Sequence, residues 1–187
     1  MEKRLTREEL LESLIKQARD PFCTPEKYDD IRKIIFFSDT FSGMNHLFVA
    51  KLFIEGDSSL FSVDEEEALR QIALALKEGN KNAYHAYYQI YKKLDEHTKA
   101  RNYLRVAYDL NHPLALLDMG KEHMDGGLFQ KDLSFAYACF GKAIKAGRKE
   151  GYYYQVLIDT LRGNIEKAKE DTRRAAVDNY PLPGVVE

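Results

Sequence analysis

The sequence predicts an all-α protein of about ten helices, arranged as five antiparallel pairs in an α-solenoid. Four times, two alanines stand seven residues apart, which is two helical turns, so both lie on one helix face. A Gly or Asn follows four residues later, and both residue types tolerate the left-handed conformation that ends a helix. The sets begin 32, 36 and 32 residues apart, and they are Ala68/Ala75/Gly79, Ala100/Ala107/Asn111, Ala136/Ala143/Gly147 and Ala168/Ala175/Asn179. This period indicates stacked helix–turn–helix units.

The N-terminal helix pair is predicted over residues 5–19 and 25–38. Apolar residues at helical spacing define the first helix, and Pro21 follows it because proline cannot continue a helix. Pro25 stands at the first position of the second helix, where proline is favoured. Because this pair lacks the alanine signature, we interpret residues 1–41 as a cap, since terminal repeats are commonly atypical.

Four repeats are predicted over residues 42–179, each made of two helices. The eight helices are expected at residues 42–55, 64–78, 82–93, 96–110, 113–125, 132–146, 150–162 and 165–178. Two prolines in residues 180–187 exclude a further helix there, so we expect an extended tail. The chain contains neither a long linker nor a sharp change of composition. Residues 1–187 are therefore predicted to form one domain.

The loops inside the second and fourth pairs are long and share the pattern Leu-Phe-x-x-Asp. Its members are Leu60, Phe61 and Asp64 in one loop and Leu128, Phe129 and Asp132 in the other. Each Asp stands where the next helix needs an N-cap, as Asp95 does in the third pair. Apolar residues before a cap commonly pack on the helix that follows. We therefore expect this pattern to anchor each loop on its helix pair.

Composition favours a cytoplasmic protein without a nucleic-acid or membrane partner. Apolar residues make up 44% of the chain and charged residues 31%, and the formal net charge is −2. No overall positive field therefore attracts nucleic acid or an anionic membrane. The charged N-terminal segment is unlike a signal peptide, and no segment is apolar enough to span a membrane. Cys23 and Cys139 are isolated, so they are interpreted as buried thiols.

One part of the chain resembles a Sel1-like repeat, a subclass of the tetratricopeptide-type helical repeats. The residues that carry the resemblance are Ala115, Gly120, Gly126, Asp132, Ala136, Phe140, Ala143, Ala146 and Gly147. Looser matches extend it over about residues 45–178. The resemblance implies a right-handed α-superhelix that acts as an adaptor or scaffold. It also implies no shared catalytic residue.

The sequence offers no pattern that indicates catalysis or metal binding. The histidines form neither HExxH nor a pair four residues apart, so zinc ligation is unsupported. No Walker loop, GxSxG or dinucleotide-binding motif follows a predicted strand. We therefore expect no catalytic residue, no metal and no cofactor.

The leading functional interpretation is a noncatalytic adaptor that binds a peptide or helix of a partner protein in its concave groove. In stacked pairs the first helices line the concave side, and residues about 100° from the packing stripe face it. Three lysines beside a Met and a Tyr suit an acidic segment next to an apolar anchor, although solvated lysines are an equally good interpretation. The predicted residues are His85, Gln89, Lys92, Lys93, Lys121, Met124 and Tyr153. The protein is expected to be a monomer or weak dimer.

The alternative interpretation is a dedicated inhibitor or immunity-type protein that blocks one enzyme or toxin. Its candidate surface is acidic and includes Glu65, Glu66 and Glu67. Clustered carboxylates are suited to filling a basic site or to mimicking nucleic acid.

Overall fold

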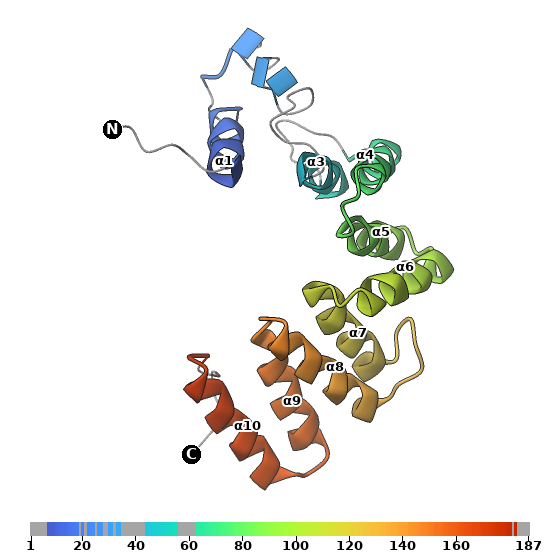
Figure 1. The fold of residues 1–187 in the computed structure, drawn as a ribbon, viewed down its shortest axis with the longest axis vertical. Helices are drawn as coiled ribbons and strands as arrows, with labels where there is room; N and C mark the ends of the chain where they lie inside the picture. The colour runs from blue at the N-terminus through green and yellow to red at the C-terminus, as the bar shows by residue number, and fades with distance from the viewer. Residues whose placement is uncertain are drawn as a thin grey trace. The chain divides into compact units, whose positions relative to one another are not determined.

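The computed structural model is all-α in the parts of the chain that it describes (Figure 1). These parts are residues 7–18, 44–55 and 63–180, with Leu182 and scattered positions between 20 and 34. Within them no strand occurs, and no helix is both long and apolar enough to cross a bilayer. The helices are α1 (Arg7–Ala18), α3 (Met44–Glu55), α4 (Glu65–Lys77), α5 (Ala83–Lys93), α6 (His97–Asp109), α7 (Pro113–Asp125), α8 (Leu133–Lys145), α9 (Glu150–Leu161) and α10 (Ile165–Val177).

Each of these helices begins and ends within two residues of its predicted position. The predicted helix over 25–38 falls largely outside the described residues, as do Leu60, Phe61 and most of the 180–187 tail. Backbone contacts group the chain into two compact units, Met1–Ile90 and Tyr91–Glu187. The single domain stays a prediction.

The repeated alanine pattern is confirmed in both of its features, the burial of the alanines and the left-handed helix ends. Ala68, Ala75, Ala100, Ala107, Ala136, Ala143 and Ala175 have no exposed surface, and Ala168 is 4% exposed. The closing residues of the four sets all have left-handed backbone, with φ of +86° at Gly79, +55° at Asn111, +88° at Gly147 and +56° at Asn179. The small side chains therefore lie where helices meet, and the helices end where the pattern places their ends.

The predicted N-caps are confirmed at two positions and wrong at the third. Asp64 accepts the Glu67 N–H at 2.9 Å, and Asp132 accepts the N–H groups of Ser134 and Phe135, each at 2.9 Å. The hydrogen bond from the Phe135 backbone N–H is the main cause of the lowered pKa of Asp132. Asp95 instead has φ +55° and follows the end of α5. Aspartate is one of the few residues that tolerate this left-handed conformation, so it serves in the turn rather than as a cap.

In the first unit, α3 packs on α4. Val49, Ala50 and Phe53 of α3 are buried, as are Ala68, Ile72 and Ala75 of α4. A side-chain hydrogen bond also joins the two helices, because His46 Nδ1 of α3 lies 2.6 Å from Gln71 Oε1 of α4.

In the second unit, α6, α7, α8, α9 and α10 pack in series, each on the next (Figure 1). The core between α7, α8 and α9 comprises Leu116, Leu117, Ala136, Phe140, Ala143 and Ile158. Gly120 permits the close approach of α7 and α8, since a Cβ atom there would lie 2.5 Å from the Phe140 ring. The resemblance singled out both residues, and the structure shows that they fit each other.

Candidate functional site: a charged pocket beside α6 and α7

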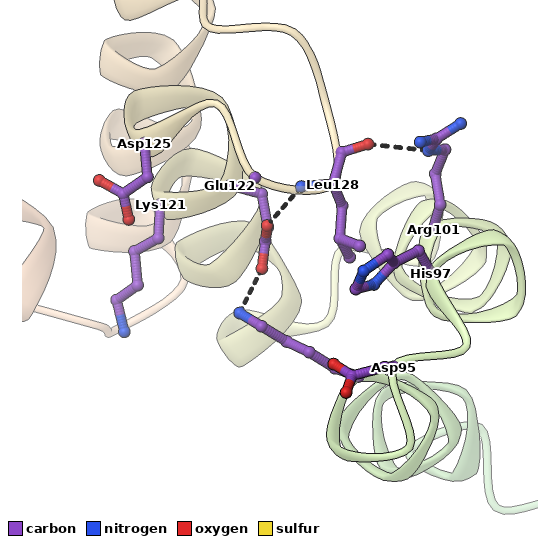
Figure 2. Close-up of a pocket in the computed structure, with 9 residues that line it drawn as sticks. Asp95, His97, Arg101, Lys121, Glu122, Asp125 and Leu128 are labelled. Atoms are coloured by element: carbon purple, nitrogen blue, oxygen red, sulfur yellow. Dashed lines mark hydrogen bonds and ion pairs between the residues drawn. The ribbon is translucent and has the colours of Figure 1, made fainter.

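The second unit contains a pocket of about 440 Å³ beside α6 and α7 (Figure 2). Charged side chains from three helices and backbone from the loop after α7 surround it. Its lining residues are Lys92, Asp95, His97, Arg101, Lys121, Glu122, Asp125, Gly127 and Leu128.

Glu122 is the buried centre of this pocket, with 4% of its surface exposed. Its Oε1 forms an ion pair with Lys92 Nζ, and its Oε2 accepts the Leu128 N–H at 2.9 Å. A buried carboxylate is strongly unfavourable unless such partners compensate for its lost hydration. Lys92 therefore neutralises a buried charge of its own chain, although its side chain is 53% exposed.

The loop after α7 is held at both backbone polar groups of Leu128. While Glu122 accepts its N–H, the Leu128 carbonyl accepts the Arg101 Nε–H at 2.8 Å, as Figure 2 shows. A Cβ atom on Gly127 would lie 2.6 Å from Glu122 Oε2, so glycine allows the loop to approach this carboxylate. The loop is thus tied to both α6 and α7.

The Leu-Phe pattern has the expected structural role in this loop. The Leu128 side chain is 5% exposed. Phe129 stacks on His123 of α7, with 4.8 Å between ring centroids and 15° between planes. His123 Nδ1–H donates to the Gln130 carbonyl at 3.1 Å. These contacts anchor the loop on α7, the first helix of its pair.

The structure brings two of the predicted lysines, Lys92 and Lys121, to this pocket. Lys121 Nζ lies 3.5 Å from the Asp118 carboxylate and 5.3 Å from the Tyr154 ring centroid. Tyr153, 46% exposed, meets the same Tyr154 ring edge-on at 5.2 Å. Lys121 and Tyr153 are therefore linked through Tyr154.

Met124 and Lys93 are the other predicted residues of the second unit. Met124 is half-buried and packs on the core between α7, α8 and α9. Lys93 is exposed in the last turn of α5. Neither lines the pocket.

His85 and Gln89 belong to the first unit. His85 is only 4% exposed, so the expectation that it faces an open groove is wrong. The cause is that α5 buries more than one stripe, since Ala83, Tyr87, Tyr88 and Ile90 are buried as well. Gln89 is exposed, and with Ala86 of α5 and Leu47, Ala50, Lys51 and Ile54 of α3 it lines a groove of about 230 Å³.

The three predicted acidic residues form the first turn of α4, after Asp64. Glu67 accepts hydrogen bonds from Arg70 Nε–H, Arg70 Nη2–H and Gln71 Nε2–H, each at 2.7 Å. It therefore has a role within its own helix. Glu65 and Glu66 are exposed, and acidic residues at a helix start also interact favourably with the helix dipole. The inhibitory function stays a prediction.

Sequence reasoning did not identify Glu122, His97 or Arg101 as members of a site. A signal existed for Glu122, because it continues the buried stripe of Ala115 and Met119 at helical spacing. A charge on such a stripe indicates a buried ion pair. Nothing local distinguished His97 or Arg101. In the described ranges, no group of three or more His, Cys, Asp or Glu side chains is placed to hold a metal.

Comparisons with known proteins identify the architecture. The sequence matches no protein-family model and no curated protein. In structure, it is similar to a Sel1 repeat protein from Oxalobacter formigenes, with a TM-score of 0.69 and 18% identity over 90% of this chain and 68% of that one.

A second similar structure is c5321, a protective antigen of uropathogenic Escherichia coli strains that displays an SLR fold. The TM-score is 0.56 and the identity 21%, over 78% of this chain. The match spans 31% of the antigen's length. With the buried alanine frame and the left-handed helix ends, these likenesses show that the chain has the all-α fold of Sel1-like repeat proteins.

Proposed function

We propose that the chain is a noncatalytic scaffold that binds a peptide or helix of a partner protein. The observation that supports this proposal is the fold itself, in which α6 to α10 pack in series and display side chains from successive helices. Stacked helical repeats offer extended surfaces of this kind to partners. A pocket with a mixed charged and apolar lining adjoins that surface.

Within the second unit, the proposed contact surface runs from the pocket past Lys121 to Tyr153. Tyr153 is the best anchor because it is an exposed aromatic residue supported by the ring of Tyr154. Tyrosine is enriched among residues that dominate binding energy, since it combines apolar area with a polar tip. Lys121 beside it adds a positive charge that favours an acidic partner.

Site-specific photo-crosslinking tests this proposal. A photoreactive amino acid replaces Tyr153 in one variant and Lys145, an exposed residue in the last turn of α8, in a control. After irradiation in an extract of the native host, the first variant should capture a defined protein that the control does not. A Lys121→Glu exchange in the first variant should reduce that capture. Equal capture by both variants, or none by either, refutes the proposed function.

A further inference from the structure

Two arginines of α6 share one aromatic ring and have no acidic partner in the described part of the chain. Arg101 and Arg105 are one helical turn apart, and both are exposed. Their guanidinium carbons lie 5.8 Å and 5.3 Å from the centroid of the Phe129 ring. Each guanidinium carries a positive charge, so two of them at one ring favour an anion.

The hydrogen bonds of the two guanidinium groups leave most of their donors available. Arg101 uses its Nε–H for the Leu128 carbonyl, and its terminal Nη groups meet no acceptor among the described residues. Arg105 contacts the Phe129 ring without a hydrogen bond to any described residue. Guanidinium Nη groups form paired hydrogen bonds with carboxylates, which makes them strong recognition groups.

The ring beneath the arginines is fixed before any ligand arrives. Phe129 is stacked on His123, and the preceding residue, Leu128, is bonded through both its N–H and its carbonyl. A prearranged site loses less conformational entropy when it binds. The arginines are therefore presented on a rigid support.

Two nearby acidic residues interact with groups other than the two arginines. Asp132 accepts two backbone N–H groups at the start of α8. The charge of Asp109, one turn beyond Arg105, contributes to the raised pKa of Lys142, and Asp109 forms no ion pair with Arg105. The lysines of the pocket that Arg101 lines differ from the arginines because each lies beside a carboxylate. Lys92 pairs with Glu122, and Lys121 lies beside Asp118.

We propose that Arg101 and Arg105 together bind two carboxylates of an extended acidic segment in the partner protein. This inference rests on the proposed function and names the chemistry of the partner. Residues four apart on a helix are about 6 Å apart along its axis. Alternate residues of an extended strand are about 6.6 Å apart and point to the same side. The pattern Glu-x-Glu therefore matches the two arginines.

A carboxylate segment fits better than a phosphate or a nucleic acid. Phosphate sites commonly add several backbone N–H donors, whereas the backbone N–H of the neighbouring Leu128 is already bonded. A formal net charge of −2 also disfavours a polyanion such as nucleic acid.

The test is an NMR titration of the intact protein with the peptide Gly-Glu-Ser-Glu-Gly. Its counterpart Gly-Gln-Ser-Gln-Gly and the phosphoserine form of that counterpart serve as comparison probes. We expect the Glu peptide alone to shift resonances of α6 and of residues 128–130, with binding that weakens as salt is added. Arg105→Gln should weaken binding about tenfold, the loss that one charged hydrogen-bonding group causes.

Two further variants distinguish specific recognition by Arg101 and Arg105 from non-specific attraction by positive charge on the protein surface. Arg173→Gln removes an exposed arginine of α10 and should leave the affinity unchanged. Phe129→Leu keeps both charges but removes the ring, so it should weaken binding while α6 stays folded. Equal binding of the Glu and Gln peptides, no effect of Arg105→Gln, or preference for the phosphoserine peptide overturns this inference.

The outcomes also separate this inference from the proposed function. If the partner captured at Tyr153 binds the Arg105→Gln variant normally, the scaffold function stands and the arginine site is wrong. If no partner is captured, the scaffold function itself fails.

Discussion

Replacement of Lys92 by methionine should destabilise the protein, although an exposed lysine ordinarily contributes little to folding. Methionine keeps most of the length of the side chain but removes the charge that neutralises Glu122, a residue 4% exposed. Breaking a fully buried pair costs about 3–5 kcal/mol. Because the Lys92 side chain is 53% exposed, water replaces part of the lost interaction, and we expect about 1–3 kcal/mol.

The assay is urea unfolding followed by circular dichroism. Lys145→Met, on the exposed surface of α8, is the matched control and should change the free energy of unfolding by less than about 0.5 kcal/mol. Combining Lys92→Met with Glu122→Gln should recover part of the loss, because the double variant buries no unpaired charge. A Lys92→Met variant as stable as the wild type would refute the assignment of Glu122 as a buried, ionised partner.

Three further predictions concern the second unit. Gly120→Ala places a Cβ 2.5 Å from the Phe140 ring, so it should lower the free energy of unfolding by roughly 1–3 kcal/mol; a thermal midpoint at or above that of the wild type would contradict this. Burial raises the pKa of Cys139 from 9.0 to about 11. As the pH rises, the thiol therefore ionises in the unfolded chain before it does in the folded protein. The free energy of unfolding should fall between pH 9 and pH 11 by at most about 3 kcal/mol relative to that of Cys139→Ala. Parallel pH profiles of the two proteins would contradict the raised pKa. Tyr137→Phe leaves the buried Asp171 without its hydroxyl donor and should cost about 1–3 kcal/mol in urea unfolding, and no measurable loss would exclude that bond.

Much of the fold could be predicted because its determinants are local. Alanines two turns apart indicate a close helix contact, and a following Gly or Asn indicates the left-handed helix end that Asn111 and Gly147 adopt. Asp95 was misassigned because Asp suits both an N-cap and a left-handed turn, and local sequence does not separate these roles.

The candidate site was less predictable because its interactions are distant in the sequence. Lys92 had the pattern of a solvated residue, yet its partner Glu122 is thirty residues away. Likewise, the support of Arg101 and Arg105 is a ring in a loop beyond the next helix. His85 was misplaced because the number of buried faces of α5 depends on its neighbours.

The serial packing of α6 to α10 also has a consequence for how the second unit folds and opens. Each helix makes its main contacts with the next along the chain, so the contacts are short in sequence. Chains with such local contacts fold quickly, because little loop entropy is lost before each contact forms. The same arrangement lets α10, the last in the series, detach without disturbing the contact between α7 and α8. Amide hydrogens should therefore exchange in a gradient along the stack, fastest in α10 and slowest in the helices around Phe140.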